Sequence, residues 1–291
     1  MTHLPRDYSG VTHDSDLIAL WLLNRPEQTQ RSYRRDAARF LAFVAPKSIP
    51  DLTVKDVGDW VASIGDTNSK NTLVRRLTNV KSLLSFAKET GYCVFNVGGV
   101  IRLPKMKRRT PERVSTGDAV RGMAAEADAG RDRILIRFIY ATGCRVSEAV
   151  GVNFGDVRIK RGPDGQRAGM VTLFGKGQKT RDVPFSLEVA QEVLALKQAG
   201  HGKDTPVFRN FVNGKRLSVR SVQRLVASVR LPGNPVVVTP HVLRHTHSLE
   251  ALQAGAKVEE LQHQLGHSDL STTTYYTHLL PGQGTGSYII V

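Results

Sequence analysis

Cysteine and long apolar runs are scarce in this 291-residue sequence, and both absences restrict what the protein can be. Its two cysteines, Cys93 and Cys144, lie far apart and neither has a CxxC partner, so we expect neither a disulfide framework nor a zinc site. The apolar run at residues 17–23 is too short to span a bilayer, and no basic segment or small-residue cleavage site marks it as a signal peptide. We therefore expect a protein of the reducing cytoplasm that is neither exported nor inserted into a membrane.

Acidic residues are outnumbered. The sequence has 26 Asp and Glu against 41 Lys and Arg, which gives a net charge of +15 and a pI near 10.1. A polyanion is the natural partner of such a chain, and nucleic acid is the commonest one. Charge alone also fits a ribosome-associated or merely soluble basic protein, so it indicates a partner but no chemistry.

The first hundred residues have the periodicity of helices and no convincing strand. Residues 27–44 place apolar side chains on one face and a basic flank beside it. Thr53 and Asp56 form a predicted capping pair for a helix through Ile64, and residues 68–90 predict another helix that stops at Gly91. The sequence therefore predicts a small helical domain that ends near residue 103. The flank cations that we expect to contact phosphates are Arg31, Arg34 and Arg35.

A basic segment follows this helical domain. Pro104 and Pro111 bracket it and keep it extended, so it suits a linker that lies along a phosphate backbone. A plain solvated linker is the alternative. Its four cations are Lys105, Lys107, Arg108 and Arg109.

The remaining sequence mixes helices with strands. Residues 115–126 and 132–141 predict helices, and the second is apolar on nearly all sides, as a central core helix would be. Residues 157–160, 170–174 and 180–185 predict a three-stranded antiparallel meander. Five further helices are predicted, over residues 186–198, 218–229, 239–254, 258–264 and 271–279.

Two helix starts in this part carry candidate phosphate ligands. Thr239 is a good N-cap and Pro240 a good first residue, so His241 and Arg244 lie one turn apart near the positive end of a helix dipole. A structural cap with a surface arginine would look the same. Arg145 begins another helix with Glu148 one turn on, and a surface salt bridge is the alternative there.

A predicted turn between two strands carries a third kind of candidate. Lys176 lies between Gly175 and Gly177, so its ammonium could contact a phosphate or act as a general acid. A solvated turn lysine is the alternative. Lys179 and Arg181 lie nearby and compete for phosphate contacts.

Four motifs resemble, in kind, order and spacing, those of the tyrosine recombinase (phage integrase) family, and most closely those of Xer-type recombinases. They are Thr-Gly-x-Arg-x-Ser-Glu at 142–148, Gly-Lys-Gly at 175–177, His-x-Leu-Arg-His-Thr at 241–246 and Leu-Gly-His-Ser-x-x-Ser-Thr-Thr-x-x-Tyr-Thr-His at 265–278. The resemblance implies a mainly α fold with a small antiparallel β-sheet, of the α+β class. It also implies three parts: a helical, SAM-like core-binding domain at 1–103, a basic linker at 104–112 and a catalytic domain at 113–291.

The resemblance further implies roles for the matching residues. Tyr276, nine residues after His267, aligns with the nucleophile; Tyr275 beside it points about 100° away on a helix. Arg145 and Arg244 would clamp the non-bridging oxygens of the phosphate, and Glu148 would support the site. His241 and His267 would donate hydrogen bonds to the phosphate, with His241 the candidate base. Lys176 would protonate the departing 5′ oxygen.

The implied activity is site-specific DNA recombination by metal-free cleavage and rejoining of strands through a 3′-phosphotyrosine. It needs neither a metal nor another cofactor, because two guanidiniums favour both the phenolate and the charged transition state. The implied partners are double-stranded DNA with a specific target site and a homo- or hetero-tetramer on two such sites, in the cytoplasm at the nucleoid.

Three other interpretations remain. A DNA-binding regulator could keep the fold, although the complete set of catalytic residues argues against decay. A metal site could be built from the five histidines His241, His245, His247, His263 and His267, but it lacks a paired carboxylate or Cys motif. A relaxing activity like that of type IB topoisomerases would share the chemistry, and the helical N-terminal domain favours the recombinase.

Two stretches depart from the family pattern. Residues 247–250 replace an aromatic and small residues, so we expect altered packing and retained catalysis. Residues 281–286 block the further helix that commonly follows the nucleophile. We expect the apolar residues 288–291 to dock as an extended segment on a neighbouring subunit or on their own domain.

Overall fold

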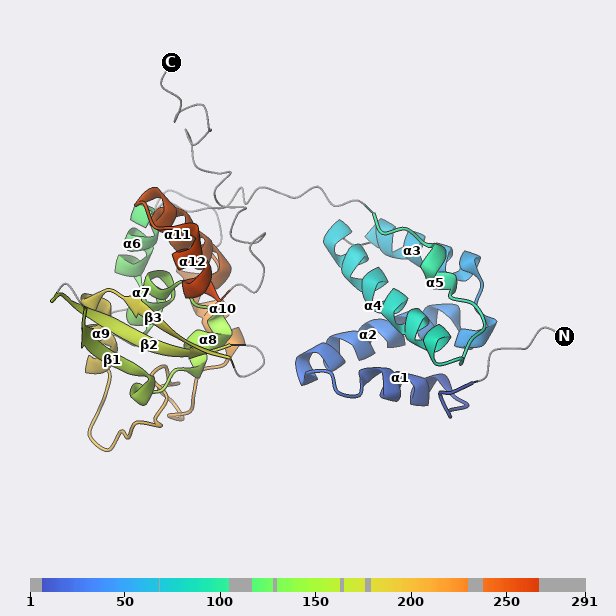
Figure 1. Cartoon of the computed structure of the whole chain (residues 1–291), viewed down its shortest axis with the longest axis horizontal. Helices are drawn as coiled ribbons and strands as arrows, with labels where there is room; N and C mark the ends of the chain where they lie inside the picture. Colours follow the sequence, from blue (N-terminus) through green and yellow to red (C-terminus); the bar gives the residue numbers. More distant parts are fainter. Residues whose placement is uncertain are drawn as a thin grey trace, which may run out of the picture. The chain divides into compact units, whose positions relative to one another are not determined.

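The structure is a computed structural model that describes residues 7–67, 69–104, 117–127, 130–162, 165–175, 179–229 and 238–266 (Figure 1). Contacts divide the chain into two compact units, residues 1–109 and 110–291. The predicted helix at 271–279, the linker cations and the apolar residues 288–291 lie outside the described residues.

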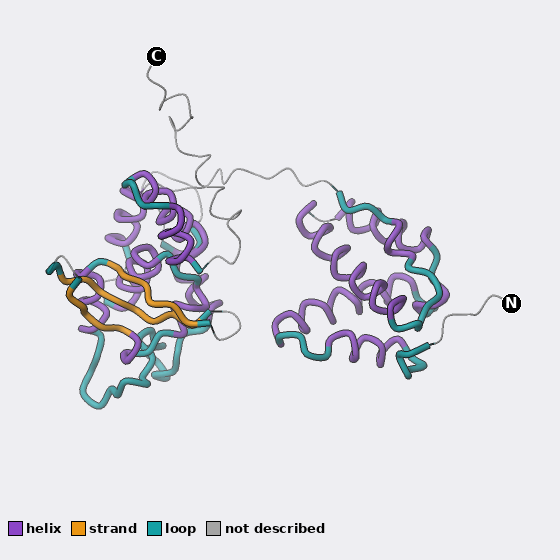
Figure 2. Tube along the Cα trace, viewed as in Figure 1, coloured by secondary structure: helices purple, strands orange, loops and turns teal. Residues whose placement is uncertain are grey.

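In the described residues of the first unit, every regular element is a helix, as predicted (Figure 2). Its main core collects apolar side chains from every long helix, and Phe40 packs edge-on against Trp60 with ring centroids 4.9 Å apart. The predicted capping pair is present, because Thr53 N donates to Asp56 Oδ2 at 2.8 Å and Asp56 N donates to Thr53 Oγ1 at 3.3 Å. The elements are α1 (Asp14–Leu22), α2 (Glu27–Val44), η1 (Ile49–Asp51), α3 (Val54–Thr67), α4 (Lys70–Glu89) and α5 (Val97–Val100).

The second unit combines helices with one three-stranded sheet, which confirms the predicted α+β class (Figure 2). Its helices are α6 (Gly117–Glu126), α7 (Arg131–Thr142), α8 (Val146–Gly151), η2 (Phe154–Asp156), α9 (Leu187–Ala195), α10 (Val219–Ser228), α11 (Pro240–Gln253) and α12 (Val258–Leu265). Its strands are β1 (Val157–Arg161), β2 (Arg167–Phe174) and β3 (Thr180–Phe185).

The sheet is the predicted meander. Its strands run antiparallel in the order β1-β2-β3, with Val171 opposite Val157 on one side and opposite Val183 on the other. These three valines are buried because one face of the sheet packs on the helices. In Figure 1, α9 lies against β1 and β2.

Helix α7 is the central core helix that its apolar sequence predicts. Leu135, Ile136, Phe138 and Ile139 have no exposed surface, and α7 contacts α6, α8, α9, α11 and β3. It ends at Gly143, whose φ of 62° turns the chain toward the start of α8. Helices α11 and α12 lie beside each other at the same end of the unit as α6 (Figure 1). None of the helices in the described residues is long and apolar enough to cross a membrane.

Candidate active site

Arg145 is the N-cap residue of α8, as the sequence predicts. Its backbone N donates to Glu148 Oε2 at 2.8 Å, so the third residue of the helix satisfies the amide that precedes it. The turn before it requires Gly143, because a Cβ there would lie 2.6 Å from the His247 ring in addition to facing a positive φ. The Thr-Gly-x-Arg-x-Ser-Glu motif therefore encodes a helix end, a tight turn and a new helix that presents a guanidinium.

Glu148 is buried and binds two arginines, so the surface salt bridge weighed as the alternative is wrong. Its side chain is 3% exposed, with Oε1 accepting from Arg145 Nη1 at 3.0 Å and from Arg181 Nη1 at 2.9 Å. Oε2 accepts from Arg181 Nη2 at 2.8 Å. Burial by itself would raise the pKa of this carboxyl, but the Arg181 hydrogen bonds, the Arg145 backbone amide and both positive charges outweigh it and lower the pKa. Glu148 is therefore a buried anion.

Arg244 comes to the same place from α11. It is 4% exposed, and its Nη1 donates to the Gly143 carbonyl at 2.7 Å while Nη2 donates to the Leu265 carbonyl at 2.8 Å. Burial and the nearby charge of Arg145 lower the pKa of Arg244 to about 10, so it stays cationic at neutral pH. The alternative of a surface arginine beside a structural cap is thus wrong for this position.

Three arginines meet at the C-terminal end of α12. The Gln264 carbonyl accepts from Arg181 Nε at 2.8 Å, the Leu265 carbonyl from Arg244, and the Gly266 carbonyl from Arg145 Nη2 at 3.3 Å. Arg145 Nη1 also approaches the Leu265 carbonyl at 3.5 Å. Cations suit this position because the last carbonyls of a helix lack intrahelical partners and form the negative end of its dipole. The next residue in the chain is His267.

His241 lies on the first turn of α11, on an exposed part of the surface. The predicted cap is present, since Thr239 Oγ1 accepts from the Val242 amide at 3.3 Å. The His241 Nε2 lies 3.0 Å from His245 Nε2. Partial desolvation and the charges of Arg244 and Arg145 lower the pKa of His241, which favours a neutral ring at neutral pH.

The residues that depart from the family pattern are part of the packing here. His247 Nε2 lies 3.1 Å from Gln264 Nε2, and burial lowers the pKa of His247 to about 4, so the ring is a neutral acceptor for this amide. Glu250 accepts a hydrogen bond from the Tyr140 hydroxyl and lies 3.8 Å from Arg121. This stretch links α11 to α12, α7 and α6.

Sequence reasoning missed the role of Arg181. Its side chain is 10% exposed and its guanidinium faces Glu148 and α12, not solvent. The signal was the period of two in β3, where Arg181 shares its face with the buried Val183 and Phe185. Lys179, its neighbour among the predicted phosphate contacts, is exposed.

The remaining predicted catalytic residues, Lys176, His267 and Tyr276, lie outside the described residues, as does Tyr275. Two of them directly follow residues that lie beside the three arginines. His267 follows Gly266, and Lys176 follows Gly175. A Cβ on Gly175 would lie 3.7 Å from Glu148 Oε1. Within the described residues, no group of three or more His, Cys, Asp or Glu is arranged to hold a metal ion.

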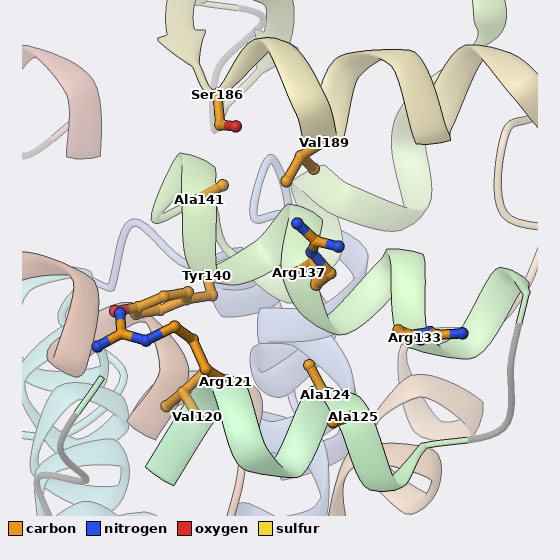
Figure 3. Close-up of a pocket in the computed structure, with 10 residues that line it drawn as sticks. All are labelled: Val120, Arg121, Ala124, Ala125, Arg133, Arg137, Tyr140, Ala141, Ser186 and Val189. Carbon is orange, nitrogen blue, oxygen red and sulfur yellow. The ribbon is translucent and has the colours of Figure 1, made fainter. Parts of the chain in front are cut away.

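A pocket of about 390 Å³ lies between α6, α7 and the start of α9, and none of the three arginines lines it (Figure 3). Its lining includes Arg121, Arg137 and Tyr140 but none of the predicted catalytic residues. Arg137 is paired with Glu188 at 2.8 Å and with Glu192 at 2.6 Å. The candidate active site is therefore the arginine cluster, which consists of Arg145, Arg181 and Arg244 around the C-terminal end of α12.

Comparison with known proteins decides the family. Residues 113–282 match the phage integrase family, and residues 20–91 match the N-terminal SAM-like domain of phage integrases. The chain belongs to the phage integrase family. The first match alone spans more than half of this chain, and it contains every predicted catalytic residue.

Known tyrosine recombinases are similar in sequence to most of this chain. Tyrosine recombinase XerC of Thermodesulfovibrio yellowstonii is 32% identical over 267 residues, which are 86% of this chain and 85% of the relative. Tyrosine recombinase XerD of Bifidobacterium longum is 32% identical over 87% of each chain, and XerC of Rhodospirillum centenum is 36% identical over 86% of this chain and 76% of its own. The protein is thus a tyrosine-type site-specific recombinase.

Solved structures show the same fold. The crystal structure of a lambda integrase dimer bound to a COC′ core site has a TM-score of 0.73 at 16% identity, over 90% of this chain and 75% of that one. The Tn1549 transposon integrase in complex with transposon right end DNA has a TM-score of 0.71 at 17% identity, over 95% and 97% of the two chains. Both likenesses confirm the predicted fold.

Proposed function

We propose that this recombinase cleaves and rejoins double-stranded DNA without a metal ion, through a 3′-phosphotyrosine on Tyr276. The observation that carries the proposal is the convergence of Arg145 and Arg244 on the carbonyls directly before His267. Two guanidiniums held side by side offer planar donors for the non-bridging oxygens of one phosphate. They supply the positive charge that the pentacoordinate transition state needs.

In this proposal each proton has a donor and an acceptor. The Tyr276 phenol attacks phosphorus, its proton passes to His241, and the bond from phosphorus to the 5′ oxygen breaks. Lys176 gives a proton to that oxygen, and His267 donates a hydrogen bond to the phosphate. The lowered pKa of His241 suits it to this task, because only a neutral imidazole can accept the proton. Rejoining reverses the steps with another 5′ hydroxyl, so the phosphotyrosine keeps the energy of the broken bond.

We further propose that the partners are a specific double-stranded DNA site and other recombinase protomers in a tetramer on two sites. A lambda integrase tetramer bound to a Holliday junction is among the solved structures of similar fold. Arg31, Arg34 and Arg35 are exposed on α2 and suit phosphate contacts, as does Lys179. The four linker cations at 105–109 are the remaining proposed contacts, and the expected site of action is the nucleoid.

The domain division that this function requires is 1–103 for core binding, 104–112 for the linker and 113–291 for catalysis. The separation of the chain into contact units near residue 109 supports this division. Each unit would then bind its own part of the DNA, while the basic linker follows the backbone between them.

The decisive experiment is covalent capture in EDTA. Wild-type protein selects a substrate from a library of duplexes that carry a random core, and the selected site is rebuilt with a nick that traps the intermediate. We expect a protein–DNA adduct for wild type and Tyr275→Phe, and none for Tyr276→Phe. An adduct that survives Tyr276→Phe and is lost in Tyr275→Phe would overturn the choice of nucleophile, and no wild-type adduct would overturn the proposed chemistry.

A further inference from the structure

Arg181 joins three elements around the candidate active site. From β3, it gives two hydrogen bonds to Glu148 on α8, at 2.9 and 2.8 Å, and one to the Gln264 carbonyl on α12, at 2.8 Å. Gly266, the next-but-one residue, packs directly on it, since a Cβ there would lie 2.9 Å from Arg181 Nη1. A planar guanidinium with its donors in fixed directions can hold such an arrangement, whereas an ammonium cannot.

The contacts of Arg181 differ from those of Arg145, one of the two arginines that we assign to the phosphate. Arg145 reaches α12 only at 3.3 and 3.5 Å, and its side chain is 44% exposed. The contacts of Arg181 are 2.8–2.9 Å long and its side chain is 10% exposed. Arg145 can therefore turn its donors to a phosphate, while Arg181 keeps its contacts with Glu148 and α12.

The negative charge of Glu148 explains why the contacts of Arg181 matter for Arg145. Glu148 is a buried anion, and a carboxylate in that position draws cations strongly because water does not compete. Arg181 occupies both of its oxygens, which leaves Arg145 a single side-chain contact with Oε1. Without Arg181, the carboxylate would pair with both terminal nitrogens of Arg145 and hold them away from a phosphate.

We propose that Arg181 is a positioning residue of the recombination reaction: it neutralises Glu148 and fixes the end of α12, so that Arg145 stays available to the scissile phosphate. The inference rests on the proposed function, because it takes Arg145 as a phosphate ligand. It replaces the expectation that Arg181 itself contacts DNA phosphates.

The test compares single-turnover cleavage and DNA affinity on the nicked substrate captured by wild type. Arg181→Met should slow cleavage at pH 7 by about 100-fold or more, which corresponds to about 2.7 kcal/mol of transition-state stabilisation. Its DNA affinity should stay within about threefold and its salt dependence should be unchanged, since no phosphate contact is lost. Arg158→Met is the matched control, because Arg158 pairs with Asp182 on the exposed face of the same sheet, and it should cleave like wild type.

The rescue experiment separates positioning from mere support of the fold. Glu148→Gln added to Arg181→Met removes the unpaired buried anion, so cleavage should recover about tenfold over Arg181→Met. Lowering the pH protonates His241 in both proteins but Glu148 first in the variant, so the rate of Arg181→Met relative to wild type should rise as the pH falls. Arg181→Lys should lie between wild type and Arg181→Met, because it keeps the charge but not the fork.

Several results would overturn the inference. Cleavage by Arg181→Met at the wild-type rate would do so, as would an equal loss of rate and affinity with a smaller salt slope, which marks a direct phosphate contact. A loss that neither Glu148→Gln nor acid relieves would show that Arg181 only supports the fold. A wild-type protein that forms no adduct would instead overturn the proposed function, and the inference with it.

Discussion

At the residue scale, the ionised state of Glu148 links folding to pH. Its pKa is lowered in the folded protein, so it contributes stability above the unfolded value of about 4.3, and that contribution is lost as pH falls through the folded pKa. We expect Glu148→Gln to lose about 1.5–3 kcal/mol at pH 7, the usual worth of hydrogen bonds to charged groups. The difference from wild type should shrink below pH 4 in urea unfolding. A difference that is equal at pH 7 and pH 3 would contradict the assignment.

Burial of His247 makes the folding stability depend on pH in a higher range than Glu148 does. Its pKa is lowered to about 4, so between pH 4 and about 6.5 the unfolded state binds more protons and stability falls as pH falls. We expect the catalytic unit, residues 110–291, to lose about 1–3 kcal/mol between pH 7 and pH 4.5, and His247→Gln to remove most of this slope.

The measurement for His247 is amide hydrogen exchange in α7 and α11. Tryptophan fluorescence would report only the other unit, because Trp21 and Trp60 both belong to its core. The exposed His263→Gln on α12 is the control and should keep the wild-type slope. An unchanged slope in His247→Gln would show that another group titrates.

Some residues of the candidate active site could be predicted from the sequence and others could not. Arg145 and Arg244 could be predicted as a pair, because family motifs carry them and local helix signals fix each one. The burial of Glu148 and the inward turn of Arg181 depend on how β3, α8 and α12 pack together, which no local pattern states. Gln264 was equally invisible, since its contact with His247 joins residues of two helices.

At the element scale, the C-terminus of α12 depends on Gly266. This residue has φ of 63°, where a side chain costs about 1–2 kcal/mol, and a Cβ would also meet the Arg181 guanidinium at 2.9–3.1 Å. We expect Gly266→Ala to destabilise the catalytic unit by more than that conformational cost and to slow cleavage on the captured substrate.

Gly255→Ala is the matched control for Gly266→Ala. Gly255 also has a positive φ, of 92°, but nothing lies within 4 Å of the added Cβ. Its loss of stability should be the conformational cost alone, with cleavage unchanged. If both variants cleave equally well, the contact of Gly266 with Arg181 does not matter for the site.

Most long elements were predicted, although the nine-residue α1 was not. The helices over 27–44 and 68–90 and all three strands were recognised because each shows several periods of its pattern. Short elements were missed: α5 has 4 residues and η1 and η2 have 3 each, too few to show a period. Helix α8, with 6 residues, was predicted only at its start, from the Thr-Gly turn before it.

At the scale of the whole molecule, the net charge of +15 belongs to two units with different tasks in the proposed function. In the catalytic unit, Arg145, Arg181 and Arg244 donate hydrogen bonds to Glu148 and to backbone carbonyls around the end of α12, so these cations are held at one site. In the first unit, Arg34 and Arg35 are exposed on α2. Affinity for DNA should therefore depend on α2, and the rate of cleavage on the arginine cluster.

Salt titration of DNA binding tests this division. Each phosphate that a cation neutralises contributes about 0.9 to the slope of log affinity against log salt. A variant with Arg31→Gln, Arg34→Gln and Arg35→Gln should reduce the slope by about 2–3 and weaken binding. The fraction of bound protein that cleaves in a single turnover should stay as in wild type.

The control for this variant removes the same charge elsewhere. Lys197, Lys203 and Lys215 are exposed on the catalytic unit and outside the predicted contacts, so changing all three to Gln lowers the net charge equally. Because exposed charges beyond about 10 Å are screened at 0.1 M salt, this control should leave the slope nearly unchanged. Equal losses in both triple variants would show that the overall field of the protein, and not local contact by α2, drives its binding to DNA.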